Sequence, residues 1–177
     1  MTAWIMRMSG RDEWLLHALV LRRRNWLDTV MRAATHLGGA RTTVSAAAVL
    51  LVAVPRGAGS RAAFALAASH LVAQAIKRAV NRPRPRMPAG VESLVHAPDR
   101  FSFPSGHSAA AMSIALPLAA MLPLAVGGAV LALALLVGIS RAYLGVHYPG
   151  DVLAGWILAL AGTLAAAPTL GALGILP

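Results

Sequence analysis

Two long apolar runs, residues 124–139 and 152–167, constrain the fold of this chain more than any other feature. Neither run contains a charged residue, and a transmembrane helix needs about 20 predominantly apolar residues to cross the bilayer core. With a few flanking residues, each run reaches that length. Hydrophobic residues make up 58% of the 177-residue chain and charged residues only 12%, which is more apolar sequence than a soluble domain of this size requires. We therefore expect an integral membrane protein.

The chain is predicted to fold as a single all-α domain over residues 1–177, a helical bundle embedded in the membrane. Its length suits one domain, and the apolar segments are separated by Pro, Gly and polar residues at which helices end. Small residues such as Gly155 and Gly162 allow helices to pack closely in lipid. We expect about five transmembrane helices, at residues 42–54, 62–80, 105–122, 124–143 and 149–170.

The first part of the chain is predicted to lie at the membrane surface. Residues 12–36 are expected to form one amphipathic helix, because their apolar run is too short to cross a bilayer and is followed by Arg22-Arg23-Arg24. Residues 1–40 would then lie in the headgroup layer, and residues 41–177 would form the transmembrane bundle. The alternative is a solvated helix packed on the bundle. Tryptophans near arginines are typical of headgroup-layer helices; here they are Trp4, Trp14 and Trp26.

The charge of the chain indicates the chemistry of its partners. The net charge is +10, from 16 Lys and Arg residues against six Asp and Glu residues. In a soluble protein this excess would suggest nucleic acid. Here the basic residues flank apolar segments, so we expect the bilayer and a lipid phosphate as partners, and no nucleic acid. The chain has no Cys, which excludes disulfides and thiolate metal sites.

The segment between the two apolar runs, residues 140–151, has the sequence SRAYLGVHYPGD. Ionisable residues at the edge of a membrane span are costly there and are therefore candidates for function. If the next helix begins at Pro149, a residue suited to the first helical position, Asp151 lies one turn from His147. The carboxylate can then hold one ring nitrogen and leave the other free to attack or to carry a proton. Arg141 adds a fixed positive charge.

Two further polar clusters are predicted to lie on the same membrane face as this segment. They flank residues 81–104, the one long loop of the chain, and long loops in compact proteins tend to be functional. Lys77 and Arg84 belong to the first cluster, and Pro104-Ser105-Gly106-His107 forms the second. Counting the predicted spans places both ends of this loop and residues 140–151 on one face. The candidate residues can therefore converge.

The second cluster is suited to binding an anion. Ser105 is a good N-cap for the helix that follows, and the free N–H groups at a helix start bind anions well. Gly106 lets the backbone approach a ligand closely. We therefore expect this helix start to contact the same ligand as the basic residues.

The charges on this face favour a phosphate ligand. Lys77, Arg84 and Arg141 bring three positive charges, whereas Asp151 is the only acid in or beside the predicted spans. We expect that local carboxylates cannot pair all three cations, which leaves them to bind an anion with several oxygens.

A catalytic zinc ion is the alternative use of the same residues. Two histidines and one aspartate could supply three zinc ligands and leave one position open. Three fixed cations nearby would repel a divalent ion, so we expect neither a metal nor any other cofactor. The zinc ligands in this alternative would be His107, His147 and Asp151.

Two histidines beside a phosphate site suggest covalent phosphoryl transfer. One imidazole attacks phosphorus and the other protonates the leaving oxygen. His147 is the better nucleophile because Asp151 accompanies it, which leaves His107 as the proton donor. The three cations and the N–H groups at Ser105 and Gly106 would stabilise the charge on the phosphoryl oxygens.

Three motifs together resemble the signatures of the type 2 phosphatidic acid phosphatase superfamily. KRAVNRPRP fits Lys-x6-Arg-Pro, FPSGHS contains Pro-Ser-Gly-His, and SRAYLGVHYPGD fits Ser-Arg-x5-His-x3-Asp. The resemblance covers residues 77–151 in the order of the family, with no motif position missing. It implies metal-independent hydrolysis through a phosphohistidine, with His147 as nucleophile, Asp151 as its orienting partner and His107 as general acid. The phosphate contacts it implies are Lys77, Arg84, Ser105, Gly106, His107 and Arg141.

The apolar spans favour the bacterial membrane lipid phosphatases within this superfamily, in the cytoplasmic membrane. That branch acts on undecaprenyl pyrophosphate, phosphatidylglycerol phosphate, phosphatidic acid, lipid A and polyprenyl-phosphate sugars. Two alternatives remain open: a phosphotransferase that uses the same intermediate, and a membrane protein that binds lipid phosphate without catalysis. The positive-inside rule points to an active site on the cytoplasmic face, whereas the analogy to undecaprenyl pyrophosphate recycling favours the outer face. We expect the cytoplasmic face.

Overall fold

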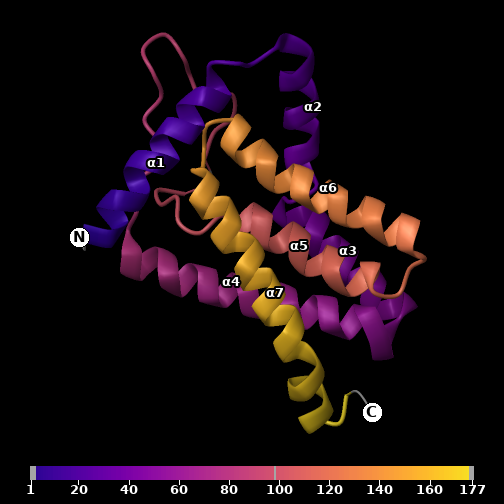
Figure 1. The fold of residues 1–177 in the computed structure, drawn as a ribbon. Coiled ribbons are helices and arrows are strands. Elements are labelled where there is room, and N and C mark those ends of the chain that lie inside the picture. The colour runs from indigo at the N-terminus through magenta and orange to yellow at the C-terminus, as the bar shows by residue number, and fades with distance from the viewer. Residues whose placement is uncertain (1–2, 98, 176–177) are drawn as a thin grey trace.

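The computed structural model describes residues 3–97 and 99–175, which form helices and a single isolated β-bridge between Pro83 and Phe101. The long loop and the segment that joins the last two helices lie at the same end of the bundle (Figure 1). The helices are α1 (Ala3–Val20), α2 (Asn25–His36), α3 (Ala40–Ala53), the short π-helix η1 (Pro55–Gly59), α4 (Ser60–Val80), α5 (Gly106–Ala119), α6 (Leu124–Tyr143) and α7 (Pro149–Ala172).

Helix α5 is the centre of the bundle, because it packs against α3, α4, α6 and α7. Its core contacts are made largely by small side chains, which let the helix axes approach closely in lipid. At Gly155 in α7 a Cβ atom would lie only 2.6 Å from the carbonyl oxygen of Ser105. Helix α7 therefore packs directly on the start of α5. The main core cluster consists of Ala111, Met112, Ala115, Ala134, Val137 and Ala159.

The prediction of one helix over residues 12–36 is wrong. Helix α1 ends at Val20 and α2 begins at Asn25, so the arginine run forms a connection between two helices. The physical reason is that Arg23 turns inward, where its side chain donates to the carbonyl oxygens of Tyr143 and Glu92. A helix continued through this point would lose that contact with the bundle.

Both N-terminal helices pack on the bundle with one face and leave tryptophan on the other. Leu16 and Val20 of α1 are buried against Tyr148, and Met31 of α2 is buried against Tyr143 and Leu144. Trp14 and Trp26 remain 70% and 64% exposed. The packing agrees with the alternative of a helix lying on the bundle, while the exposed tryptophans suit contact with lipid headgroups.

The five predicted spans correspond to α3 through α7, with ends within a few residues of the expected positions. Among the described helices, α6 and α7 are each long and apolar enough to cross a membrane. Helices α2 and α3 together form a third candidate, a broken span bent by 49°. Helices α3 and α5 have 14 residues each, about 21 Å at 1.5 Å per residue, which is shorter than the bilayer core. The number of spans remains a prediction.

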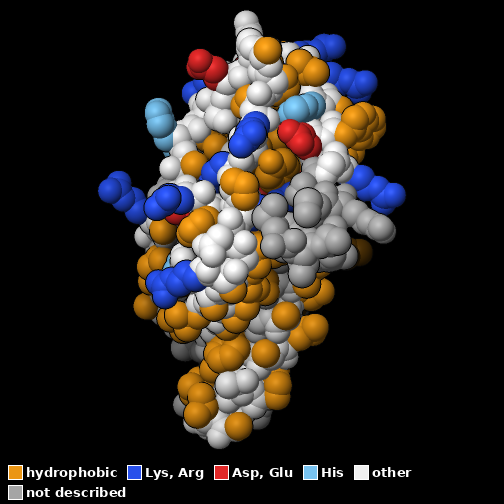
Figure 2. Space-filling view, turned by 90° about the vertical axis from the view of Figure 1, so that its left-hand side faces the viewer, with side chains coloured by type: hydrophobic (Ala, Val, Ile, Leu, Met, Phe, Trp, Pro, Cys, Tyr) orange, Lys and Arg blue, Asp and Glu red, His pale blue; other side chains and the backbone are white. Residues whose placement is uncertain are grey.

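The surface is divided by polarity along the length of the molecule. Figure 2 shows charged and histidine side chains over the upper and middle parts of one face, around the loop and the N-terminal helices. The lowest part of that face, toward the C-terminal end of α7, carries hydrophobic and uncharged side chains. This division fits a protein whose polar end meets the headgroup layer and whose remainder lies in lipid.

Candidate active site

His147 lies in the connection between α6 and α7 and is 2% exposed. Its Nε2 atom is 2.9 Å from Nη1 of Arg84. A guanidinium group only donates hydrogen bonds, so Nε2 accepts and we infer that Nδ1 carries the proton. Nδ1 faces Oδ2 of Asp151 at 3.6 Å, which is longer than a hydrogen bond. The imidazole is thus held as a neutral base with its lone pair on Nε2.

The surroundings of His147 keep it uncharged at neutral pH. Burial lowers the pKa of His147 from its ordinary value to about 4. Asp151 acts in the opposite direction, whereas the charges of Arg84 and Arg141 lower the pKa further. A neutral imidazole is the form that can attack phosphorus.

Asp151 is fixed on both of its carboxylate oxygens at the start of α7. The side chain is fully buried. Oδ2 accepts a hydrogen bond from the backbone N–H of Tyr148 at 2.8 Å, and Oδ1 accepts one from Nη1 of Arg82 at 2.7 Å. The first of these closes the N-terminus of a helix that begins at Pro149, as expected.

Two residues that hold Asp151, one directly and one through the other, were not predicted from the sequence to belong to the site. Arg82, 5% exposed, donates through Nη2 to Oδ2 of Asp12 in α1 at 2.9 Å. The other oxygen of Asp12 accepts from the backbone N–H of Gly150 at 2.9 Å. One available signal was the spacing of Asp12 and Leu16, which places the acid on the buried face of α1.

We expected that local carboxylates cannot pair all three cations, and among the described residues two of the three, Lys77 and Arg84, do have a carboxylate partner. Asp99, in the long loop, forms ion pairs with both of them. Burial of the Asp99 carboxyl group acts to raise its pKa, but the contacts with Lys77 and Arg84 outweigh burial and hold it below its usual value. The sequence placed Asp99 in the loop but gave no sign that the loop folds back over these cations.

Arg141, in the last turn of α6, is the cation that remains without an acid. It is 3% exposed, and its Nη1 donates to Oγ1 of Thr35 in α2 at 2.6 Å. Its Nε and Nη2 atoms are buried and have no partner among the described residues. Buried donors without acceptors are costly, so this guanidinium is ready to receive an anion.

The start of α5 faces the same region. Ser105 caps the helix, because its Oγ accepts hydrogen bonds from the backbone N–H and the hydroxyl group of Ser108. A Cβ atom at Gly106 would meet open space, so a ligand can approach the backbone there. His107, in the first turn, lies within electrostatic range of His147 and of the basic residues. Those basic residues are Lys77, Arg84 and Arg141.

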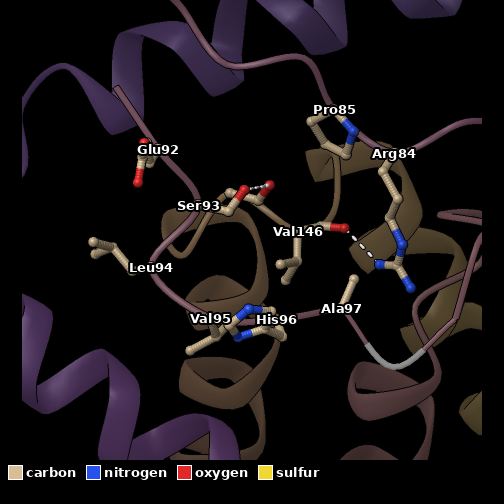
Figure 3. Close-up of a pocket in the computed structure, with 10 residues that line it drawn as sticks. Arg84, Pro85, Glu92, Ser93, Leu94, Val95, His96, Ala97 and Val146 are labelled. Atoms are coloured by element: carbon tan, nitrogen blue, oxygen red, sulfur yellow. Dashed lines mark hydrogen bonds between the residues drawn. The ribbon is translucent and has the colours of Figure 1, made fainter. Parts of the chain in front are cut away.

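A cavity of about 380 Å³ opens beside Arg84. Its other walls come from the long loop and from the backbone around Gly145 and Val146. Figure 3 shows the Arg84 side chain extending along one wall, where it donates to the carbonyl oxygen of Val146, with Ser93 on the opposite side. A ligand in this cavity reaches the guanidinium group that also contacts His147.

The zinc alternative has no counterpart in the parts of the chain that the structure describes. No three or more His, Asp or Glu side chains gather there in an arrangement that could hold a metal ion. Asp151, one of the three ligands considered, uses both of its oxygens for Arg82 and Tyr148.

Comparisons with known proteins relate both the sequence and the fold to phosphatases. The model of the PAP2 superfamily matches residues 58–173. Phosphatidylglycerophosphatase B of Bacillus subtilis is 35% identical over 174 residues, which cover 86% of this chain and 80% of that protein.

Two crystal structures are similar to the fold. LpxE of Aquifex aeolicus superposes with a TM-score of 0.78 at 25% identity, covering 87% of this chain and 93% of that one. The transmembrane PAP2-type phosphatidylglycerolphosphate phosphatase of Bacillus subtilis gives a TM-score of 0.74 at 32% identity, covering 92% of this chain and 86% of that one.

Proposed function

This chain belongs to the PAP2 superfamily and is a membrane lipid phosphatase, and on that premise we propose that it works through a phosphohistidine at His147. In the first step Nε2 attacks phosphorus, the N–P bond forms and the bond from phosphorus to the lipid oxygen breaks. His107 must start in its protonated form, which the negative charge of the bound phosphate would favour, and it gives that proton to the lipid oxygen as the lipid leaves. In the second step water attacks phosphorus, His107 takes a proton from it, and phosphate departs from the restored His147.

Asp151 supports this step by its charge. As Nε2 forms the bond to phosphorus, the imidazole gains a positive charge, and its Nδ1–H faces the buried carboxylate at 3.6 Å. The carboxylate therefore stabilises the imidazolium that forms during attack more than it stabilises the neutral histidine before attack. Such preferential stabilisation of the transition state is the requirement for catalysis.

The single observation that carries the proposal is the buried Arg141 with two unpartnered donors. An arginine that is 3% exposed and contacts a hydroxyl group instead of a carboxylate is stable only if an anion completes its hydrogen bonds. The phosphoryl oxygens would fill that role, together with Arg84, Lys77 and the N–H groups at the start of α5. Arg84 would move from Nε2 of His147 to a phosphoryl oxygen, which frees the nucleophile.

We propose phosphatidylglycerophosphate as the first substrate to test, because the sequence and the structure comparisons each include a Bacillus subtilis protein named for that activity. The phosphate would enter from the bilayer side of the polar end of the bundle. We further propose that the protein resides in the bacterial cytoplasmic membrane with its active site on the cytoplasmic face, which follows from the basic residues gathered around the site.

The test is phosphate release by protein purified in detergent, with excess EDTA present. The substrates are phosphatidylglycerophosphate, undecaprenyl pyrophosphate, phosphatidic acid and a water-soluble phosphate ester. His147→Ala should abolish release, because no other group replaces the nucleophile. His70→Ala is the matched control, since His70 is an exposed histidine of α4, and it should keep the wild-type rate.

A second readout identifies the intermediate. Brief reaction with a substrate labelled in its terminal phosphate should leave an acid-labile label on wild-type protein and none on His147→Ala. Wild-type release without such a label, or full activity of His147→Ala, would refute the phosphohistidine. Release that EDTA stops would show that a metal takes part.

A further inference from the structure

Helix α1 reaches the site through a chain of three buried charged groups, Asp12, Arg82 and Asp151. The Arg82 guanidinium donates from Nη2 to Asp12 and from Nη1 to Asp151, at 2.9 and 2.7 Å. Its planar face lies over the ring of Tyr148, 4.1 Å from the ring centroid. These contacts fix the guanidinium in three directions, so the position of Asp151 depends on residues about 70 positions apart in the sequence.

The charges of these three groups sum to a net negative charge beside His147. Arg82 alone beside Asp151 would cancel much of the negative charge that His147 needs when it becomes an imidazolium. Asp12 pairs with the outer side of Arg82, so the cluster as a whole carries a net charge of −1. The excess is met by backbone N–H groups of Gly150 and Tyr148 at the start of α7, where a helix N-terminus favours negative charge.

The hydrogen bonds also set the orientation of the carboxylate. With Oδ1 of Asp151 taken by Arg82, Oδ2 is the oxygen that faces Nδ1 of His147. If Arg82 lost its second anchor on Asp12, it could turn, and the carboxylate would lose the contact that fixes its plane. Asp12 has no hydrogen bond to His147 or to the phosphate-binding residues, so its influence on the reaction must pass through Arg82 or through the backbone at Gly150, both of which adjoin Asp151.

We propose that Asp12 and Arg82 are positioning residues that orient Asp151 and keep a net negative charge beside His147, which makes α1 a working part of the site. The inference rests on the proposed function, because it assigns a role in the phosphohistidine step. It concerns residues that the motifs of the sequence do not include, and Asp12 lies outside residues 58–173, the part matched by the family model.

The main test is Asp12→Asn, which keeps the size of the side chain and removes one charge. We expect kcat to fall about tenfold or more, the order expected when a buried charge is removed near the developing imidazolium. KM and inhibition by vanadate should change less than about twofold, because Asp12 makes no contact with the phosphate region. Asp12→Glu should restore part of kcat by returning the charge.

The control variant is Glu13→Gln, the neighbouring acid on the same helix. Its side chain is 47% exposed and takes no part in the hydrogen bonds of Arg82, and its one ion-pair contact is with His17 at 4.0 Å. It should keep the wild-type kcat. Arg82→Lys, which keeps the positive charge but loses the two-pronged geometry, should lower kcat as Asp12→Asn does.

A double-mutant cycle separates positioning from simple support of the fold. In an Asp151→Asn background, Asp12→Asn should lower the residual kcat less than about twofold, because its route to His147 is already broken. An equal fold loss in both backgrounds, or a loss matched by a fall in melting temperature, would overturn the proposal and leave Asp12 as a structural tie. If Asp12→Asn does not fold, Arg82→Lys takes its place in the same double-mutant cycle with Asp151→Asn.

A failure of this inference about α1 can be distinguished from a failure of the proposed function. Wild-type release that is lost in His147→Ala, combined with wild-type kcat in Asp12→Asn, would refute only the role of α1. Unchanged release in His147→Ala would refute the phosphohistidine itself, whatever Asp12→Asn did.

Discussion

Two clusters of carboxylates and basic residues meet at His147, and they differ in how far water reaches them. In the inner cluster, Arg82 lies between Asp12 and Asp151, and the side chains of Arg82 and Asp151 are 6% and 0% exposed. In the outer cluster, Asp99 bridges Lys77 and Arg84, and the Asp99 side chain is 38% exposed. Both clusters therefore consist of ion pairs between carboxylates and basic side chains, but the inner cluster is shielded from water and the outer one is partly exposed.

The difference teaches which ion pairs can be exchanged. Removing one partner from a buried ion pair leaves a charge that water cannot reach, so such a cluster is held permanently. An exposed pair contributes little stability and can be replaced by another anion at small cost. We propose that the inner cluster is part of the framework of the site, while Asp99 holds Lys77 and Arg84 in place of the phosphate proposed to bind them.

Breaking the inner cluster should have the largest effect. Asp151→Asn keeps the shape of the side chain but removes its charge, so the imidazolium of His147 is no longer stabilised and the wrong tautomer becomes accessible. We expect kcat to fall by about 10³-fold or more, as in other histidine–carboxylate pairs. Single-turnover phosphate release measures the chemical step directly. A kcat within tenfold of wild type would show that Asp151 does not act on His147.

The dependence of rate on pH should distinguish the two clusters. Neutral His147 is the active form and its pKa is lowered to about 4. Protonation of His147 should therefore cause no loss of kcat/KM as pH falls from 7 to 5, and kcat/KM should drop below about pH 4, as the nucleophile is protonated. Any change of kcat/KM above pH 5 would report the proton that His107 must carry as general acid. Asp151 raises this pKa. Asp12 is linked to Asp151 through Arg82, whereas Asp99 is held by Lys77 and Arg84.

The same profile in two variants completes this test. In Asp12→Asn the acid limb should shift to lower pH, because the negative charge near His147 is reduced, while in Asp99→Asn it should stay in place. Each sample is returned to pH 7 and assayed again, which corrects for irreversible loss of protein. An acid limb near pH 6.5 in wild type would contradict the burial of His147 as the cause of its low pKa.

The sequence predicted the elements better than the contacts between them. The starts of α5, α6 and α7 were predicted from the sequence, because Ser105, Pro123 and Pro149 are local signals of a helix start. The break after Val20 was missed, because the inward turn of Arg23 depends on Tyr143, far away in the chain.

The prediction of the site had the same limit, because it named single residues but not the contacts between them. The motif residues were identified because each motif is short and local, and the topology of the spans brought them to one end. Asp12, Thr35 and Asp99 were missed as partners, because their contacts with Arg82, Arg141 and Lys77 join separate segments of the chain. Which acid pairs with which base is decided by tertiary packing, and no local pattern in a single sequence records it.

Removing Asp99 should have the smallest and opposite effect. Asp99→Asn leaves Lys77 and Arg84 without their carboxylate, so phosphate no longer has to displace a competing anion. We expect the inhibition constant for inorganic phosphate to fall about threefold, the size of an exposed ion pair. Added salt should narrow the difference, because exposed charges are screened.

Glu13→Gln is the control for this variant, since it removes an exposed acid that takes no part in the ion pairs of Lys77 and Arg84. Its phosphate inhibition constant should match wild type. A weaker affinity for phosphate in Asp99→Asn would mean that Asp99 holds Lys77 and Arg84 in place for the substrate. In that case the outer cluster would also belong to the fixed framework of the site. The exposure of a cluster would then not predict whether its ion pairs can be exchanged for phosphate.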